Sequence, residues 1–409
     1  MYTSTALTLA LAAIAPVALA QTVSGEAPGF AAGTTGGAAG ETVTPTTTDE
    51  LVSYLESDEA LTILINQEFD FTGTEGTTTE TGCAPWGTAS GCQLAINAND
   101  WCGDNPAAEV TYDVAGTTAI NVGSDKTILG VGDAGVIRGK GLRFVNSVSN
   151  VIIQNIHITE LNPQYVWGGD AITLDGSSNI WIDHVKVSLI GRQFIVSGYE
   201  TNTGISITNS EFDGQTSWSA SCDGNHYWGL FFIGEGDQIT FKGNYIHHTS
   251  GRSPKVGGNA LFHAVNNYWA DNPGHAFEGE EAYVLLEGST FDNVANPLQD
   301  FAASLYAPSS SDSACSDALG RACAANVLES SGELSGTDSS VLSQFSGLTI
   351  ADADADASGV PTSAGIGKIS SSSSRNKTKS RKRSARSARK LHQPRRLWAG
   401  AEEEDVVAF

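Results

Sequence analysis

Basic residues are scarce over most of this chain. Residues 1–367 hold ten Lys and Arg against 42 Asp and Glu, a net charge of −32, whereas residues 368–409 hold twelve against four. A surface with so much charge of one sign repels polyanions, which argues against nucleic acid as a partner of the main body. The few basic residues before position 368 are therefore candidates for a specific role.

Long apolar runs are absent after the first twenty residues. Residues 1–20 are apolar, contain no Lys or Arg, and end in the tripeptide ALA, the small-x-small pattern of signal cleavage. Pro16 interrupts this run, which is also short for a membrane span. We expect a signal peptide over residues 1–20, a mature chain that begins near Gln21, and a secreted protein without a membrane anchor.

The six cysteines contain no CxxC pair. An even number of cysteines in a secreted chain indicates disulfides rather than a metal site. A bond between Cys83 and Cys102 would close a loop of about 20 residues and contribute about 3 kcal/mol, but spacing alone leaves the pairing open. The histidines, including His247 and His248, also lack metal-ligand spacing. We expect neither a metal nor another cofactor.

Helical periodicity is rare, whereas glycine is common at 45 residues. Short runs rich in Ile and Val alternate apolar and polar residues, and Asn or Gly recurs in the middle of a run. The runs start at Ile152, Ile180, Ile205, Ile239, Leu261 and Val284, 22 to 34 residues apart. We interpret them as strands of a right-handed parallel β-helix with stacked Asn at its turns, since a propeller blade needs about 40 residues.

One short helix and one tail complete the predicted organisation. Residues 46–55 place Thr47 or Thr48 at an N-cap, acids in the first turn and apolar residues at helical spacing, so we expect a helix that caps the β-helix. We assign residues 21–366 to the β-helix domain. Residues 367–409 form a basic, low-complexity tail that we expect to be disordered, with the only glycosylation sequon at Asn376.

Several aromatic residues lie outside the predicted strands. Because aromatic faces stack on sugar rings, these residues are candidates for the wall of a substrate cleft, with core packing as the alternative for each. The longest loop, residues 213–229, is a candidate binding wall on a rigid scaffold. The six candidates are Trp86, Trp101, Trp167, Trp218, Tyr227 and Trp228.

Six motifs occur in the order VWGGDAITLD, IWIDHV, IGRQ, CDGNHYWG, HHTSGRSPKV and HAVNNYW. With these motifs the chain, from about Val23 to Phe345, resembles the fungal-type pectin lyases of the pectate lyase superfamily. The resemblance implies a parallel β-helix with long loops around a cleft, a monomer, and β-elimination of methylesterified galacturonan to 4,5-unsaturated oligosaccharides. It also implies disulfides Cys83–Cys102, Cys92–Cys222 and Cys315–Cys323.

The same resemblance places catalytic residues. Motif matching puts the base that abstracts the C5 proton at Arg252, and its partners at Arg192 and Asp170. The residues themselves support this assignment, because β-elimination builds negative charge on carboxyl oxygens that guanidinium groups would stabilise. Lys255 follows in the same motif and is assigned to substrate binding, with ordinary surface ion pairs as the alternative reading of the arginines.

Three alternatives remain at this point. The first is a calcium-dependent pectate lyase with Asp170 as a ligand. Against it, no acid lies between Asp183 and Glu200 to serve as a further ligand, and the positive charge of Arg192 would take the place of the ion. The second is a polygalacturonase, which needs paired carboxylates, and the third is a non-catalytic carbohydrate-binding β-helix. Asp183 and His184 look like an acid–base pair, but adjacent strand positions face opposite ways, so we expect a structural role for them.

Overall fold

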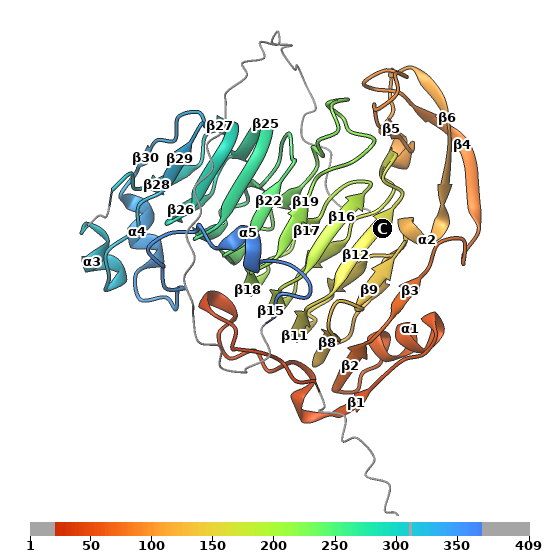
Figure 1. The fold of residues 1–409 in the computed structure, drawn as a ribbon, viewed down its shortest axis with the longest axis horizontal. Coiled ribbons are helices and arrows are strands. Elements are labelled where there is room, and N and C mark those ends of the chain that lie inside the picture. Colours follow the sequence, from red (N-terminus) through yellow and green to blue (C-terminus); the bar gives the residue numbers. More distant parts are fainter. Residues whose placement is uncertain (1–20, 311–312, 370–409) are drawn as a thin grey trace, which may run out of the picture.

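The computed structural model describes residues 21–310 and 313–369, shown as a coloured ribbon in Figure 1. The expected signal peptide, Asn376 and nearly all of the basic tail lie outside the described residues. Within them the chain forms a stack of parallel strands that wind as a solenoid, which confirms the predicted parallel β-helix.

Each complete coil contributes one strand to each of three faces. The first face contains β1 (Glu41–Val43), β2 (Leu61–Ile65), β8 (Lys126–Gly130), β11 (Ser149–Gln154), β15 (Ser178–Asp183), β18 (Thr203–Thr208), β21 (Gln238–Lys242), β24 (Leu261–Val265), β26 (Tyr283–Glu287), β28 (Ser304–Ala307) and the antiparallel β30 (Gly336–Thr337). The second face contains β3 (Glu68–Asp70), β9 (Val136–Arg138), β12 (His157–Leu161), β16 (Lys186–Ile190), β19 (Glu211–Asp213), β22 (Tyr245–His247) and β29 (Val327–Glu329). The third contains β7 (Ile120–Asn121), β10 (Leu142–Val145), β14 (Ile172–Asp175), β17 (Ile195–Ser197), β20 (Leu230–Phe232) and β23 (Lys255–Val256).

Two long strands join the second and third faces near the C-terminal end. They are β25 (Tyr268–Gly279) and β27 (Thr290–Phe301). The start of β25 pairs with β22 and its end pairs with β23. A loop therefore separates these two faces only in the earlier coils.

The runs that the sequence presents as single strands are each two strands that meet at a corner. In these six runs the corner between the first and second faces is two residues long, and its first residue has a positive φ, the left-handed conformation that Gly and Asn adopt most readily. These first residues are Asn155, His184, Asn209, Gly243, Asn266 and Gly288. In five of the six runs the Asn or Gly in the middle thus marks a turn of the coil, and in the sixth His184 takes that place.

Register on the first face follows the predicted alignment except for two slips. Ile180, Ile205 and Ile239 pair in one row as expected, and Phe262 and Val284 continue it. The expected starts at Ile152 and Leu261 are wrong by one residue, because Val151 and Phe262 occupy the row. A one-residue slip exchanges the faces of a strand.

In the last four of these corners the second residues form the expected polar ladder, and they are Ser210, Asn244, Asn267 and Ser289. Asn244 Oδ1 accepts from the Ser210 amide, and Asn267 Oδ1 accepts from the amide and side chain of Asn244. Ser289 Oγ then accepts from the Asn267 amide, at 3.1 Å. These bonds satisfy buried backbone groups at successive turns, which such a tight corner otherwise leaves unpaired.

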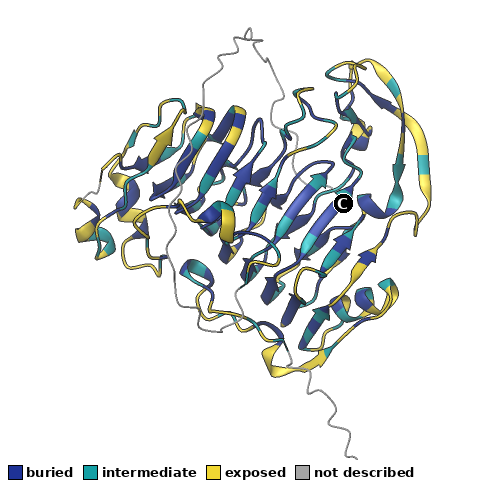
Figure 2. Cartoon of the chain, viewed as in Figure 1, coloured by how far each residue is buried: buried dark blue, intermediate teal, exposed yellow. Residues whose placement is uncertain are grey.

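The interior of the solenoid is apolar from end to end, as the buried strands in Figure 2 show. Stacked rings run along it, for example Phe194 on Phe212 and Phe212 on Phe241, with centroids 6.0 and 5.9 Å apart. Truncation of one such ring to Ala typically costs 3–5 kcal/mol. The core is therefore a rigid platform for the loops at its corners.

The predicted helix exists as α1 (Thr48–Glu56), and Thr47 is its N-cap, with Oγ1 accepting from the Glu50 amide at 3.2 Å. Leu51 and Leu55 bury their side chains in the end of the core. The remaining helices are α2 (Val114–Thr117), α3 (Cys315–Leu319), α4 (Ser340–Phe345), α5 (Val360–Ser363), η1 (Gly29–Ala31), η2 (Gly36–Ala39) and η3 (Ala98–Asp100).

Both ends of the described chain pack along the outside of the solenoid. Residues 21–40 run across the first face, where Ala31 N donates to Ser206 Oγ. Residues 350–367 follow the corner between the first and second faces, where Gly365 N donates to Asn209 O and Gly367 N to Asn155 Oδ1. The packed domain therefore extends through residue 367, beyond the end of the resemblance at Phe345.

Residues 77–113 form a feature that the sequence did not predict. The strands β4 (Thr77–Cys83) and β6 (Ala107–Asp113) make an antiparallel hairpin, joined by β5 (Leu94–Ala95) and β13 (Tyr165–Val166) in a separate small sheet. Figure 1 shows the hairpin projecting from the solenoid. The disulfides join Cys83 to Cys102, Cys92 to Cys222 and Cys315 to Cys323, the pairs that the resemblance implies.

Candidate active site

The corner between the second and third faces carries the charged candidates. Its loops, residues 162–171, 191–194, 214–229 and 248–254, lead into β14, β17, β20 and β23, which are neighbours in the sheet. Asp170, Arg192, Trp228 and Arg252 each lie two or three residues before these strands. Because adjacent strands are about 4.8 Å apart, the backbones of Arg192 and Arg252 are about 10 Å apart along the solenoid.

Arg192 and Asp170 form a two-point ion pair. Arg192 Nε donates to Asp170 Oδ1 at 3.0 Å, and a second guanidinium nitrogen donates to Oδ2 at 2.7 Å. The amide of Gln193 donates to Oδ1 as well, at 2.8 Å. Both side chains are largely buried, with 4% and 16% exposure. This fork geometry fixes the guanidinium and commits both carboxylate oxygens to it.

Two further groups hold Arg192 in place. Its guanidinium carbon lies 4.0 Å from the centre of the Trp167 ring, a cation–π contact. The Nε2 of His226 donates to the carbonyl of Arg192 at 2.6 Å. Burial lowers the pKa of His226 to about 4, so its ring is neutral near pH 6 and carries the donated proton on Nε2. A small pocket opens beside this group, lined by Thr117 and Asp170 among others.

Arg252 lies among aromatic rings. Its guanidinium carbon is 4.8 Å from the Phe231 ring centre, 4.9 Å from Trp228 and 5.8 Å from Tyr227. The residue is 3% exposed and has a φ of 37°, an uncommon conformation for a non-glycine residue. Its carbonyl accepts from the Leu230 amide, which ties the turn to the next strand of the third face.

A largely buried carboxylate, Glu278, with a side chain 12% exposed, stands beside Arg252 and Lys255. Burial raises its pKa, but the hydrogen bond from His275 and the positive charges of Arg252 and Lys255 outweigh that effect and lower it. His275 Nε2 lies 2.5 Å from Glu278 Oε1, and the Tyr227 hydroxyl donates to the same oxygen at 3.3 Å. Sequence reasoning missed Glu278, although its register opposite Lys255 follows from the strand spacing.

Five of the six predicted aromatic residues form one cluster around the two arginines. Ring centres are 6.3 Å apart for Trp86 and Trp101, 5.9 Å for Trp86 and Trp228, and 6.4 Å for Trp101 and Trp167. Tyr227 packs edge-on against Trp228 at 5.2 Å. This cluster joins the front loop, residues 84–106 between β4 and β6, to the loops at the corner between the second and third faces.

Burial divides the predicted aromatic residues. Trp228 is 2% exposed and Trp167 is 6% exposed, so their faces are used by the arginines and the cluster, and they are unsuited to bind sugar directly. Trp86, Trp101 and Tyr227 are half-buried. Trp218, also half-buried, lies outside the cluster, in the loop between β19 and β20.

Gln93 connects the aromatic cluster to the Arg192 loop and was missed in the sequence. Its Nε2 donates to Gly191 O at 2.7 Å, and its Oε1 accepts from Trp228 Nε1 at 3.1 Å. The adjacent Cys92–Cys222 disulfide ties the front loop to the loop that carries Trp228. Its position beside Cys92 was the only sequence signal for such a role.

The expectation for Asp183 and His184 needs a correction. We expected the two side chains to point apart, but His184 Nδ1 lies 2.7 Å from Asp183 Oδ2. His184 is the left-handed corner residue, so the alternation of a flat strand does not apply to it. Asp183 also accepts from Thr208 and Asn209, which makes the pair part of the corner network.

The described residues contain no helix with the length and apolar character that a bilayer crossing requires.

A protein-family model described as "Pectate lyase" matches residues 3–368. Pectin lyase A of Emericella nidulans is 56% identical over 361 residues, 86% of this chain and 95% of that protein. Pectin lyase 2 of Aspergillus oryzae is 55% identical over 350 residues, 84% of this chain and 93% of that protein. Pectin lyase D of Aspergillus niger is 53% identical over 351 residues, 84% and 94% of the two chains.

Solved structures of pectate lyases share the fold. A Bacillus pectate lyase in complex with trigalacturonate has a TM-score of 0.52 and 21% identity, and covers 84% of this chain and 99% of its own. A pectate lyase from Paenibacillus sp. 0602 has a TM-score of 0.57 and 16% identity, and covers 85% and 97% of the two chains. These likenesses agree with a right-handed parallel β-helix.

Proposed function

The chain belongs to the pectate lyase family, and from that premise we propose that it is a pectin lyase acting on methylesterified (1→4)-α-galacturonan. The reaction is a β-elimination. A base takes the proton from C5 of the uronate ester, the electrons of that bond form the C4–C5 double bond, and the C4–O bond breaks. The departing oxygen takes a proton from water. The products are a 4,5-unsaturated ester end and a new chain end.

The observation that carries this proposal is the placement of two buried guanidinium groups along one corner of the solenoid. Asp170 accepts two hydrogen bonds from the Arg192 guanidinium, which fixes this cation in one position. In the transition state negative charge develops on the ester carbonyl oxygen. A fixed cation in a water-poor site stabilises that charge more than it stabilises the neutral ester, which is the condition for rate enhancement.

We assign the base to Arg252, with Arg192 as the electrostatic partner. Three ring faces surround the Arg252 guanidinium, and the carboxylate of Glu278 stands beside it. An arginine in water keeps its proton, so this role requires a neutral guanidine in the substrate complex. The pH dependence of kcat reports the group that must lose a proton in that complex.

Substrate binding belongs to the half-buried aromatic residues Trp86, Trp101 and Tyr227 and to Lys255. Ring faces of this kind stack on pyranose rings, and Lys255 supplies a donor beside Arg252. The strongly acidic domain disfavours a chain of free carboxylates. One like-charge pair about 10 Å apart costs roughly 0.4 kcal/mol in water, before screening. The preferred substrate is therefore highly esterified pectin.

The ultraviolet absorbance of the unsaturated product tests the reaction. We expect kcat/KM to fall as methyl esters are removed from the pectin, with partial recovery at moderate salt. A product without this absorbance would indicate a hydrolase, and the absence of any product a binding protein. Equal or greater efficiency on polygalacturonate at both salt concentrations would favour a pectate lyase.

A conservative variant tests the base. Arg252→Lys should keep the fold and lower kcat at least about a hundredfold, because lysine has neither the fork geometry nor the proton affinity of arginine. Arg138→Lys is the matched control, since Arg138 is a half-exposed residue of the second face that pairs with Glu160. Near-normal turnover by folded Arg252→Lys would remove Arg252 from the mechanism.

We place the enzyme outside the cell, as a monomer that acts on plant cell-wall pectin. Three disulfides suit an oxidising compartment. Edman sequencing of the secreted protein should begin near Gln21, and mass spectrometry before and after deglycosylation should show whether Asn376 carries a glycan. A mature N-terminus at Met1 would contradict the proposed leader.

A further inference from the structure

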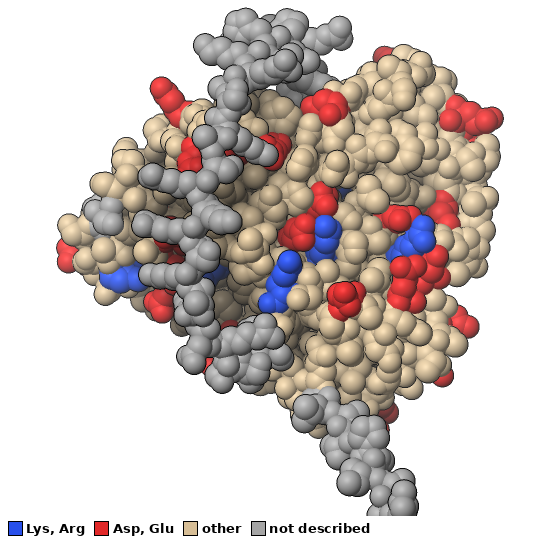
Figure 3. Space-filling view, in the orientation of Figure 1, with Lys and Arg blue, Asp and Glu red and all other residues tan. Residues whose placement is uncertain are grey.

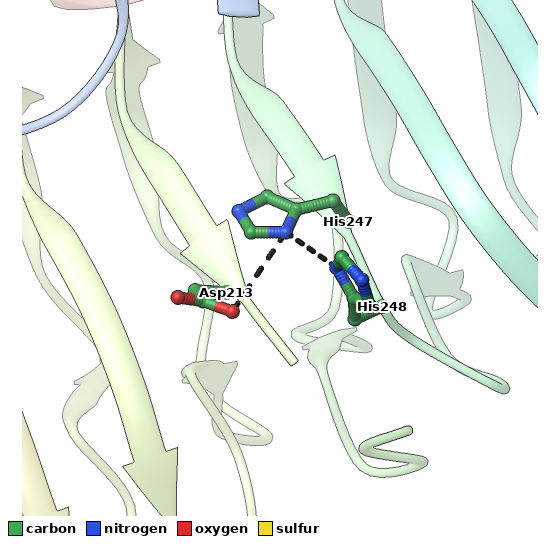
Figure 4. Close-up of side chains that lie close together, drawn as sticks. All are labelled: Asp213, His247 and His248. Carbon is green, nitrogen blue, oxygen red and sulfur yellow. Dashed lines mark hydrogen bonds and ion pairs between the residues drawn. The ribbon is translucent and has the colours of Figure 1, made fainter. Parts of the chain in front are cut away.

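Two histidines and one aspartate converge on the second face, away from the arginine corner. Asp213 ends β19, His247 ends the adjacent strand β22, and His248 follows it. His247 Nδ1 lies 2.8 Å from His248 Nδ1 and 3.7 Å from Asp213 Oδ1. Figure 4 shows the two rings and the carboxylate turned toward one another. Among the described residues, this is the one group of three such side chains whose ligand atoms lie within 4.8 Å of each other.

Backbone conformation explains how two adjacent histidines meet. Successive residues of a flat strand point to opposite faces, and for that reason sequence reasoning found no metal-ligand spacing here. His248 has a φ of 55°, which takes it out of the strand conformation just after β22. Its ring therefore turns back toward His247.

A neighbouring carboxylate prepares His247 as a ligand. Its Nε2 lies 3.3 Å from Glu211 Oε1. Lys186 Nζ donates to the same Glu211 oxygen at 2.8 Å. Glu211 Oε1 accepts the Nε2 proton, so Nδ1 of His247 is the nitrogen that faces His248 and Asp213. Carboxylate–histidine pairs of this kind are typical behind metal ligands.

A hydrogen bond from Lys186 orients the third residue of the group, Asp213. Lys186 Nζ binds its Oδ2 at 3.0 Å, which leaves Oδ1 turned toward His247. Ligands about 2.0 Å from a tetrahedral ion lie about 3.3 Å from one another, a value between the two distances observed. His248 also lines an open hollow, together with Asn225, Asp271 and Asn293, which offers a route from solvent to this residue.

We propose that Asp213, His247 and His248 bind one divalent transition-metal ion, with zinc as the reference ion. Imidazole nitrogen with one carboxylate suits zinc, copper or nickel, and poorly suits calcium, which takes six or more oxygen ligands. The ion would cross-link β19, β22 and the start of the loop that leads to Arg252. Figure 3 shows the face that carries it, where basic side chains lie beside acidic ones.

Calorimetry with Zn²⁺ alone tests the site in the full-length protein after chelation and desalting. We expect one equivalent of zinc to bind to the unsubstituted protein, and His248→Ala and Asp213→Asn each to weaken that binding at least tenfold. Glu211→Gln should weaken it about 10–100-fold, the usual effect of losing the partner behind a ligand. His157→Gln is the control, because His157 lies on the same face but bonds Ser188 instead.

Cobalt gives a second readout. Co²⁺ bound in place of zinc should show the visible absorption of a tetrahedral site in the unsubstituted protein and in His157→Gln, and lose it in His248→Ala. Urea unfolding checks that each variant is folded. Where His247→Ala fails to fold, His248→Ala and Asp213→Asn decide the matter, because both residues are only partly buried. No zinc binding by the unsubstituted protein, or unchanged binding by these variants, would overturn the proposal.

Discussion

Replacement of Asp170 by Asn removes the negative charge that pairs with Arg192 but nearly keeps the shape of the side chain. The asparagine oxygen can still accept from the Gln193 amide, but its NH₂ group faces a guanidinium nitrogen where Oδ2 stood 2.7 Å away. One charge-assisted hydrogen bond becomes a contact between two donors, and a nearly buried cation loses its counter-ion. Breaking a buried pair from one side typically costs 3–5 kcal/mol. We expect Asp170→Asn to lower the free energy of unfolding by about 3 kcal/mol and kcat by at least about a hundredfold.

A double-mutant cycle with Arg192→Gln makes the reasoning refutable. Removing both charges leaves no buried cation, so the double variant should be more stable than Asp170→Asn alone, while activity stays low because the transition state still lacks its cation. Urea unfolding followed by fluorescence measures stability, and product absorbance measures turnover. The half-exposed pair of Arg138 and Asp70, at 3.6 Å, is the control, and Asp70→Asn should cost no more than about 1 kcal/mol. A loss below about 1 kcal/mol for Asp170→Asn, with additive effects in the double variant, would show that the pair is not coupled.

Three further outcomes are expected. Cleavage of esterified pectin should survive EDTA, because Asp170 is committed to Arg192; loss of activity with recovery on added calcium would contradict this. Removal of residues 370–409 should leave the melting temperature unchanged. Removal from residue 347 onward should lower it, because the hydrogen bonds of Gly365 and Gly367 to the corner are lost. Equal melting temperatures of the two truncated proteins would show that residues 347–369 add no stability. Burial raises the pKa of Glu287, but hydrogen bonds from Arg321 and His263 lower it to about 2. Its ordinary value is near 4.5, so its contribution of roughly 3 kcal/mol is complete above pH 4.5 and declines as the pH falls toward 2. Glu287→Gln should flatten the unfolding free energy over that interval, and an unchanged slope would exclude Glu287 as its source.

Much of the scaffold was predictable because the β-helix repeats one local rule. Alternation of apolar residues fixed the first-face strands, and the row of Ile180, Ile205 and Ile239 is in register as expected. The slip at Ile152 arose because this isoleucine packs outward against Trp181 and the N-terminal segment. Hydrophobicity alone does not distinguish a core position from an outer one that another segment covers.

The site was less accessible from sequence. Motif matching found Asp170, Arg192 and Arg252 but gave no reason for their distances, since these depend on which strands stack. Glu278 reaches the site from the coil next to that of Lys255, and Gln93 from the segment between β4 and β6; neither lies in one of the matched motifs. The histidine pair was missed because its convergence depends on one left-handed residue, His248.

The corner between the first and second faces and the corner between the second and third faces differ in how freely their length can change. At the corner between the first and second faces, an inserted residue would break the ladder of hydrogen bonds such as that from Asn244 to Asn267. The register of the following strands would then have to change. The loops over residues 191–194 and 214–229 differ widely in length, yet both return the chain to the same row of strands. Lengthening such a loop adds closure entropy only logarithmically. Grafting or diversification of sequence is therefore best directed at the loops of this corner. New residues there would change the surface that faces the substrate and leave the strands of the solenoid in place.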